Sequence, residues 1–428
     1  MTTSKPHSEM EQRLITHIDR YGPITFQAFM EAALYDRDHG YYPNTRRQSV
    51  ATGIGTDGDY FTSPAAHPAF GALVALQLRE MWQIMGSPYE FNVVEMGAGD
   101  GKLASDISAY VENQLPDFAE SMQYLATDLV PPTTGDALVK GISAIPAGIS
   151  GCVISNELLD SHPVNRFIVA GGRIKEILID YQEGAFTELV NDITNPEIEA
   201  RILPFLPSLP ECYKGEVNLG LGYWADSVAA TLSHGYLLTI DYGYDRPDLY
   251  APARNSGSLR CYYQHTLGQN PLHRIGKQDI TAHVDFTAVD HMLAVNNFEK
   301  YGWTSQAKFL LNLGIEDFIE DVSIRSSRDG ISRAEWEEEM AGMGTLIDPK
   351  GMGRFRVSVH SRDIERAGGN SGPLTGISGG KTLAMGHKPP SIETSSVHHT
   401  RPLRAANPFH RHEPVDLSTW DQLFSDER

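Results

Sequence analysis

The feature that most constrains this chain is a glycine-rich turn between an apolar segment and an amphipathic one. The turn reads Glu95-x-Gly97-x-Gly99-x-Gly101 and follows the apolar run 91–94. Helical spacing of apolar residues resumes over 102–111. The order strand, glycine turn, helix is expected of one unit in a parallel α/β sheet. Glycines let the backbone turn tightly and approach a ligand closely, because no Cβ stands in the way.

Three interpretations of this turn are open on the motif alone. A dinucleotide site has the fingerprint G-x-G-x-x-G, which would need glycine or alanine where this chain has Lys102. An ordinary turn between a strand and a helix would need no ligand. The third interpretation is a ligand site of another type, in which an acidic residue, here Glu95, stands two positions before the first glycine.

The rest of the central region repeats the alternation of strand and helix. Further strands are predicted at Tyr124–Thr127, Cys152–Ser155 and Tyr236–Ile240, with helical segments between them. This rhythm predicts an α/β fold with a mostly parallel, doubly wound sheet. In such a sheet ligands bind outside the carboxyl ends of the strands.

Polar residues stand directly after each of these strands. Asp128 follows the second strand, and its carboxylate could accept hydrogen bonds from ribose hydroxyls or cap a helix. Asn156, Glu157 and Asp160 follow the third strand, and Asp241 follows the fourth. Carboxylates at these positions could hold a guanidinium group by two hydrogen bonds and orient one nitrogen. Alternatively, Asp160 caps a helix and Glu157 is a solvated residue at the end of its strand.

The composition of the chain limits the kinds of binding partner and the cellular compartment that we expect. The formal net charge of −20 argues against nucleic acid and suits a cationic partner, such as a protein that presents arginine, although acidity for solubility explains it as well. No apolar run approaches the roughly 18 residues of a membrane span, and no secretory or transit peptide is visible. The three cysteines have no metal-binding spacing. We therefore expect a cytoplasmic protein with no membrane span and no metal site.

Three regions are expected along the chain. Residues 1–64 are predicted to form N-terminal helices and a long loop, with a capping box at Ser8 and Glu11. Residues 65–360 are predicted to form the catalytic domain, with an insertion at about 165–230 that contains two strands around Gly171-Gly172. Residues 361–428 are rich in Gly, Ser, Thr, Pro and His and are predicted to be a disordered tail. The helices within 286–350 are compatible with a homodimer interface.

Taken together, several motifs resemble those of the MidA-like class I S-adenosylmethionine-dependent methyltransferases. The resemblance covers about residues 24–359 of this chain. The family includes a mitochondrial complex I assembly factor that methylates a protein arginine. Its landmarks in this sequence are Leu34-Tyr35, Gly40-Tyr41-Tyr42, Gly58-Asp59-Tyr60-Phe61-Thr62-Ser63-Pro64, the turn at Glu95, Asn156–Asp160, Ile240–Gly243, Gly257–Arg260, Tyr263, His265, Asp279–Phe286 and Met352-Gly353.

The resemblance implies a Rossmann-like catalytic core, bound S-adenosyl-L-methionine and a protein substrate bearing arginine. It implies that the cofactor is bound by Glu95, Gly97, Ala98, Gly99, Gly101, Asp128 and Leu129. The transfer site would contain Asn156, Glu157, Asp160 and Asp241. The substrate side would contain Thr62, Ser63, Tyr242, His283 and Asp285.

Two departures from the family pattern concern the substrate side. Ala65 stands where the family usually has a glutamate, and Leu158 and Leu159 replace aromatic residues. Two alternatives to a protein-arginine methyltransferase stay open. One is a small-molecule methyltransferase with the insertion as a lid. The other is an assembly chaperone that binds the cofactor without transferring a methyl group.

Overall fold

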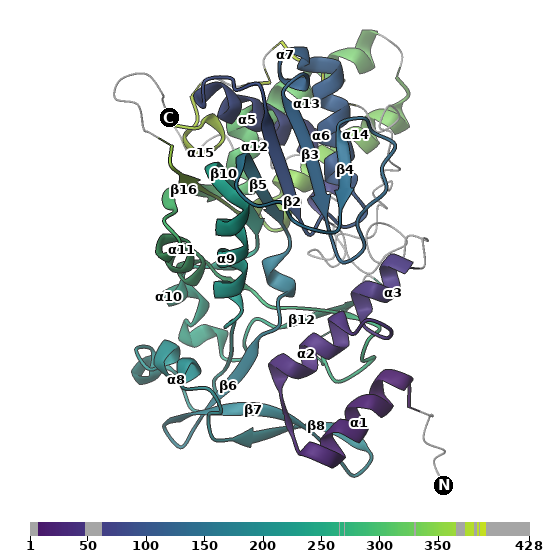
Figure 1. Ribbon diagram of the computed structural model, residues 1–428. Coiled ribbons are helices and arrows are strands. Elements are labelled where there is room, and N and C mark those ends of the chain that lie inside the picture. Colours follow the sequence, from purple (N-terminus) through teal and green to yellow (C-terminus); the bar gives the residue numbers. More distant parts are fainter. Residues whose placement is uncertain are drawn as a thin grey trace.

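The computed structural model describes residues 7–47, 62–264, 266–268, 270–328, 331–364, 373–380, 383–384 and 386–390. Its centre is a seven-stranded sheet in the upper part of Figure 1. The strands, in their spatial order, are β16 (Glu299–Ser305), β17 (Arg356–Arg362), β10 (Leu232–Asp241), β5 (Ile149–Asn156), β2 (Phe91–Met96), β3 (Met122–Thr127) and β4 (Val139–Ile142).

Strand directions confirm the predicted doubly wound α/β fold. The five strands from β10 to β4 are parallel, while β17 runs antiparallel to both β10 and β16. The predicted strands at 124–127, 152–155 and 236–240 are parts of β3, β5 and β10. The sheet therefore brings the carboxyl ends of four motif-bearing strands to one edge.

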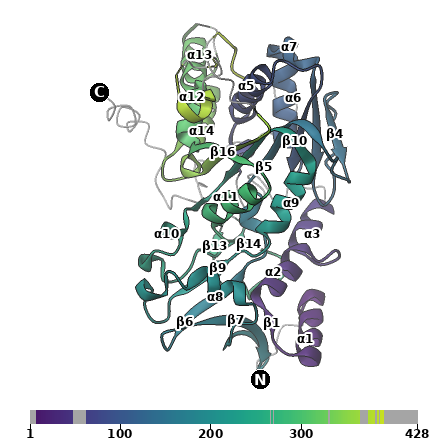
Figure 2. The same ribbon diagram turned by 60° about the vertical axis from the view of Figure 1, so that its left-hand side comes forward.

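Helices cover both faces of this sheet, so its strands are apolar on both sides. One face packs on α5 (Ala69–Ile84), α6 (Lys102–Gln114), α12 (Gln306–Leu313), α13 (Ile315–Arg328) and α14 (Arg333–Ile347). The other face packs on α9 (Leu221–Thr231) and α11 (Phe286–Val295), which lie side by side in Figure 2. The neighbours Val93 and Val94 point to opposite faces, and each is fully buried. Burial of one such side chain contributes about 1.5–3 kcal/mol.

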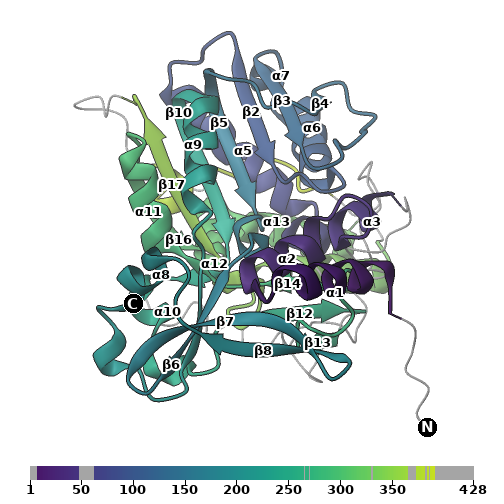
Figure 3. The same cartoon turned by 60° about the horizontal axis from the view of Figure 1, so that its bottom comes forward.

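A second body lies below the sheet in Figure 1 and combines the N-terminal helices with the insertion. It contains α1 (Glu9–Tyr21), α2 (Phe26–Tyr35) and α3 (Tyr41–Arg47). Its antiparallel sheet consists of β1 (Ile24–Thr25), β6 (Asn165–Ala170), β7 (Arg173–Gln182), β8 (Ala185–Asn191) and β9 (Lys214–Val217). A smaller sheet contains β12 (Arg260–Tyr263), β13 (Thr266–Gly268) and β14 (Asp279–Thr281). Figure 3 shows α1 and α2 next to these strands.

The N-terminal helices and the insertion share one apolar core. Met30 and Leu34 of α2 are fully buried in the same cluster as Ile179 of β7 and Ile280 of β14. The predicted capping box begins α1, because the Ser8 side chain accepts from the amide of Glu11 and the Glu11 carboxylate accepts from the amide of Ser8. Helices α1 and α2 are therefore packed firmly against the insertion.

Two predicted boundaries differ from the structure. The insertion was expected to reach about residue 230, but α9 packs on the main sheet through Trp224 and Val228 and belongs to the catalytic core. The tail was expected to be disordered from residue 361, but β17 reaches Arg362 and α15 (Thr375–Ser378) packs against the main core. Leu374 and Ala384 are fully buried there, because these apolar side chains of a largely polar segment pack into the main core. Residues 391–428 lie outside the described part of the chain.

Among the described residues, no helix is long and apolar enough to cross a membrane. Helices α11 to α14 bury apolar residues in the clusters of the protein's own sheet. The homodimer considered from the sequence stays a prediction.

We expect Leu374→Ala to lower the free energy of unfolding by about 2–5 kcal/mol, because it leaves a cavity in the main core. Leu203→Ala, at a side chain that is 53% exposed, is the matched control and should change it by less than about 0.5 kcal/mol. Urea unfolding followed by circular dichroism measures both. Equal stabilities of the two variants would contradict the packing of this segment.

Candidate active site

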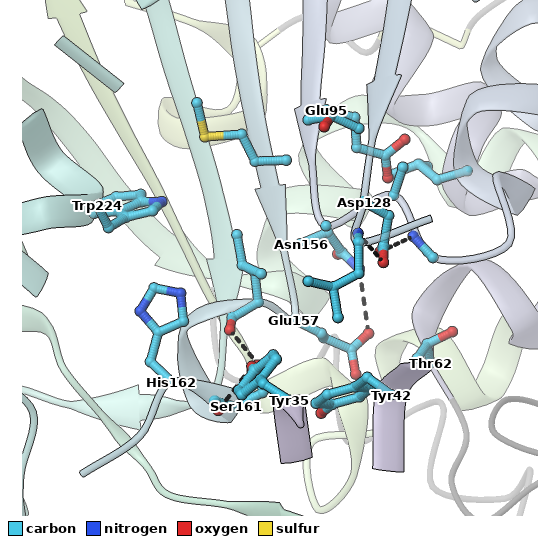
Figure 4. Close-up of a pocket in the computed structure, with 18 of the residues that line it drawn as sticks. Tyr35, Tyr42, Thr62, Glu95, Asp128, Asn156, Glu157, Ser161, His162 and Trp224 are labelled. Atoms are coloured by element: carbon cyan, nitrogen blue, oxygen red, sulfur yellow. Dashed lines mark hydrogen bonds between the residues drawn. The ribbon is translucent and has the colours of Figure 1, made fainter. Parts of the chain in front are cut away.

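A cavity of about 490 Å³ lies at the carboxyl ends of β2, β3 and β5. From β2 the chain passes to β3 and β4 on one side, and β5 returns on the other side. The connections that leave β2 and β5 therefore diverge and open a crevice between the two strands. Figure 4 shows side chains from the main sheet and from the N-terminal helices around this cavity.

The glycine turn after β2 forms one wall. The amides of Gly97 and Ala98 both donate to the carbonyl oxygen of Thr127, each at 2.9 Å. Gly97 has φ 76°, and a Cβ on it would lie 2.8 Å from Cδ1 of Leu158. Gly99 has φ 62° and also lines the cavity. Glycine is favoured at both positions because the backbone is left-handed there.

Gly101 has a different place from the one predicted. It precedes α6 with φ 82°, and a Cβ on it would lie 3.0 Å from Pro132 and 3.0 Å from Thr134. It does not line the cavity. The third glycine of the motif therefore shapes the start of the helix, while the first two face the ligand space.

Asp128 links the ends of β2 and β3. Its Oδ2 accepts from the amide of Gly99 at 2.8 Å, and its Oδ1 accepts from the amide of Leu129 at 2.7 Å. No helix begins there, because residues 128–138 form no helix, so the alternative of a helix cap does not apply. Asp128 and Leu129 both line the cavity, and Leu129 is 55% exposed.

Glu95 lies inside the wall behind the turn. It is 3% exposed and still reaches the cavity lining. The hydroxyl of Tyr124 donates to its Oε2 at 2.9 Å. Burial raises the pKa of Glu95 to about 8, and the hydrogen bond from Tyr124 opposes this shift.

Glu157 follows β5 in a strained conformation that aims its side chain at the cavity. Its φ is 47°, in the left-handed region, and its amide donates to the carbonyl oxygen of Ile240 at 2.8 Å. Oε1 accepts from the amide of Ser63 at 3.0 Å and from Nδ2 of Asn156 at 3.4 Å. Oε2 has no hydrogen-bond partner among the described residues. Strain of this kind often accompanies function.

The carboxyl of Glu157 is costly to ionise in this place. Burial raises its pKa to about 8, and the hydrogen bond from Ser63 only partly opposes the shift. Next to it, Oδ1 of Asn156 is buried without a partner in the described structure. Buried polar atoms are normally hydrogen-bonded. The open oxygens of Glu157 and Asn156 at one wall therefore indicate space for a ligand that donates hydrogen bonds to them.

Asp241 and Asp160 do not line the cavity, unlike their predicted role. Asp241 is fully buried, and its Oδ2 accepts from the amides of Leu159 and Asp160 at 2.9 and 3.4 Å. Burial, and then repulsion by Asp160, raise its pKa well above the usual range. Burial raises the pKa of Asp160 to about 6. The carboxyl of Asp241 therefore supports the turn that carries Glu157 and Asp160.

The predicted substrate-side residues separate into two groups. Thr62 lines the cavity, and the amide of Ser63 holds Glu157. In contrast, His283 and Asp285 border a separate, much smaller cavity, and Tyr242 packs against His283 at 5.5 Å between ring centroids. Asp285 caps α11 through the amide of Ala288. Sequence order alone could not show that this segment turns its side chains away from the crevice.

Several residues of the cavity were not assigned a role from the sequence. Tyr35 and Tyr42 belong to family landmarks, and Lys102 served only to argue against a dinucleotide site. His162 and Trp224 carry no pattern that marks them. All five line the cavity. Burial lowers the pKa of Lys102, which is 6% exposed, and lowers that of His162 to about 4.

Among the positions that depart from the family pattern, Leu158 lines the cavity and Ala65 does not. Ala65 is fully buried in α4 (Ser63–Ala66) and is absent from the lining. The landmark residues Gly58–Phe61 and His265 lie outside the described residues.

Comparison with known proteins shows what kind of enzyme has this site. Residues 73–134 and 137–304 match the sequence profile of a family described as S-adenosyl-L-methionine-dependent methyltransferases. The chain belongs to this family. The match confirms the predicted family, the methyltransferase activity and the cofactor S-adenosyl-L-methionine.

Relatives of this methyltransferase match it over most of their length. A Drosophila melanogaster protein named protein arginine methyltransferase NDUFAF7 homolog, mitochondrial, is 27% identical over 412 residues, covering 87% of this chain and 89% of the fly protein. The human protein arginine methyltransferase NDUFAF7, mitochondrial, is 23% identical over 83% of this chain and 85% of its own. A Burkholderia thailandensis protein crystallised with S-adenosyl-homocysteine is 26% identical with a TM-score of 0.72, covering 91% of this chain and 100% of its own.

The predicted cytoplasmic location is corrected by the same comparisons. The fly, rat and human relatives are all named as mitochondrial proteins. Scattered cysteines and the absence of a disulfide framework indicate only a reducing environment, so they do not separate these compartments.

We expect Gly99→Val to abolish binding of S-adenosylmethionine, because the branched side chain would enter the cavity and strain a left-handed backbone. Gly171→Val is the matched control, since Gly171 has φ 60° with open space around it and lies in the β6–β7 turn. Isothermal titration with S-adenosylmethionine measures both variants. Wild-type affinity in Gly99→Val would contradict the position of the ligand space.

Proposed function

We propose that this methyltransferase modifies an arginine side chain of a partner protein. The observation that carries the proposal is Glu157, whose Oε1 is fixed by Ser63 while Oε2 is left open at the wall of the cavity. A fixed carboxylate can hold a guanidinium group and set the direction of one nitrogen. The protein arginine methyltransferases among the relatives support the same acceptor.

The cofactor would occupy the part of the cavity next to the glycine turn. Its volume of about 490 Å³ lies in the usual range for pockets that enclose small ligands. Gly97, Ala98 and Gly99 would allow the close approach of its amino-acid part, and Asp128 would accept from ribose hydroxyls. Glu95 would support the turn from behind.

Lys102 is a further candidate for cofactor binding. Lys102 is buried and lines the cavity, and its positive charge would attract the carboxylate at the amino-acid end of the cofactor. The positive end of α6 lies at the same place and also favours an anion.

The bound cofactor supplies a methyl group on a positively charged sulfur. The chain's own residues supply position and a proton acceptor. Glu157, once ionised, would pair with the cationic guanidinium and take the proton that leaves the methylated nitrogen. Asp241 would act as a positioning residue, because its contacts with the amides of Leu159 and Asp160 fix the turn behind Glu157.

A small-molecule acceptor is the second candidate. The cavity walls include the aromatic residues Tyr35, Tyr42 and Trp224, which suit a compact planar ligand. The third candidate, a cofactor-binding chaperone without transfer, has no observation that favours it over the others, because a chaperone needs no open carboxylate at the transfer site.

The direct test is methyl transfer from tritiated S-adenosylmethionine into a protein extract of the source organism from which this protein has been removed. We expect label in methylarginine after hydrolysis, and none with Glu157→Gln, which should still bind the cofactor. Label only in small metabolites would support the second candidate. Wild-type biological activity in Glu157→Gln would support the chaperone.

The pH dependence follows from the raised pKa of Glu157. Below about 8 its carboxyl is mostly protonated, so kcat/KM for an arginine acceptor should rise about tenfold per pH unit and level off above about 8. Arginine itself stays charged throughout this range. Glu95 has a similar pKa, so the affinity for S-adenosylmethionine must be measured at each pH. A rise that persists in Glu157→Gln would contradict the assignment.

A further inference from the structure

Two tyrosines from the N-terminal helices form a wall of the cavity, although their helices pack mainly on the insertion. Tyr35 is the last residue of α2, and Tyr42 lies in α3. Their ring centroids are 5.3 Å apart with 39° between the ring planes. Figure 4 shows both rings on the same side of the cavity as Glu157 and Thr62.

The hydroxyl groups of these tyrosines are fixed by partners on other elements. The Tyr35 hydroxyl lies 3.1 Å from the carbonyl oxygen of Ser161 and 2.9 Å from its Oγ. The Tyr42 hydroxyl donates to Oδ1 of Asp279 at 2.7 Å. Because each ring is tied at its hydroxyl end, it cannot turn away from the cavity. The partner of Tyr35 lies in the same turn as Glu157, which couples the aromatic wall to the carboxylate.

The electrostatics of this wall favour a cation. The face of an aromatic ring is negative and attracts guanidinium groups within about 6 Å. A phenol that donates to a carboxylate, as Tyr42 does, becomes richer in electrons. Burial keeps Tyr35 protonated, because it raises its pKa well above 10. The carboxyls of Asp279, Asp160 and Asp128 act on the Tyr35 hydroxyl and add negative potential at this wall.

We propose that Tyr35 and Tyr42 form the acceptor subsite and select a planar cation by contact with their ring faces, beside the carboxylate of Glu157. This proposal rests on the proposed function, because it names the residues that recognise the arginine side chain. The ring faces supply selectivity for charge and flatness, and Glu157 supplies direction. The N-terminal segment is then a part of the active site.

A purely structural role for the two tyrosines is the alternative, since both rings also pack against the core of the second body. Replacement by leucine tests packing and cation binding together. Fluorinated phenylalanines separate them, because fluorine reduces the negative charge of the ring face while the shape changes little.

The experiment uses the full chain saturated with S-adenosyl-homocysteine and titrated with Nα-acetyl-arginine methylamide. The citrulline analogue is the matched neutral probe, because it has nearly the same shape without the charge. We expect the arginine probe to bind at least about tenfold more tightly. We expect Tyr35→Leu and Tyr42→Leu each to weaken its binding about five- to tenfold with unchanged affinity for S-adenosyl-homocysteine. Tyr89→Leu, at a side chain that is 86% exposed, should change neither affinity.

A ring series at position 42 keeps the test valid if the leucine variants do not fold. Tyr42→Phe should retain most of the affinity for the arginine probe, and a trifluorinated phenylalanine at the same position should lose it. Equal affinities of the arginine and citrulline probes, or no response to fluorination, would overturn the proposal.

If tritium transfer to protein arginine occurs but these variants bind the probe normally, only the subsite is wrong. If transfer fails while selectivity for the arginine probe and the response to fluorination hold, the subsite stands and the proposed acceptor protein is wrong.

Discussion

The structure depends on one constraint, which is that β2 and β5 are adjacent parallel strands whose following connections diverge. The parallel ladder between the two strands places Val93 beside Cys152 and Val94 beside Val153. The register places the glycine turn after Met96 beside Asn156. Strand pairing therefore brings together two motifs that are about 60 residues apart in the sequence. The pairing of β2 with β3 adds Asp128 and Leu129 to the same side of the crevice.

The acceptor side depends on the turn 157–161, which joins the two bodies of the molecule. Glu157 is held from α4 by Ser63, Asp160 accepts through its carbonyl oxygen from Ala282, and Ser161 contacts Tyr35. Asp241 fixes the same turn from behind. The cost of burying these carboxyls is visible in the raised pKa values of about 8 for Glu157 and about 6 for Asp160. Under the proposed function, a cationic acceptor beside Glu157 would stabilise the ionised form of its carboxyl, and this would favour arginine as the acceptor.

The sequence was most informative where a local pattern determines the structure. The glycine turn, the strands that end at Asp128 and Asn156, and the hairpin at Gly171-Gly172 lie where they were predicted, because each depends on backbone conformation or alternating burial. The sequence could not separate carboxylates that face the cavity from those that face backbone amides. Glu157 and Asp241 both follow strands, and only the surrounding fold decides that the second one is buried.

Residues that reach the site from distant elements carried no local signal of their role. Tyr35, Tyr42 and Trp224 look like ordinary apolar positions of helices, and their placement depends on how α2, α3 and α9 pack. The same holds for Leu374, which lies in a polar segment and still enters the main core. Composition predicts whether such a segment as a whole is exposed, whereas tertiary packing determines which of its side chains are buried.

The central claim is that the crevice between β2 and β5 binds S-adenosylmethionine rather than a dinucleotide. The most direct measurement is isothermal titration of the purified full chain with S-adenosylmethionine and, in parallel, with NAD. We predict binding of S-adenosylmethionine at micromolar affinity or better and no detectable heat with NAD. A folded sample that binds NAD, or that binds neither compound, would contradict the account.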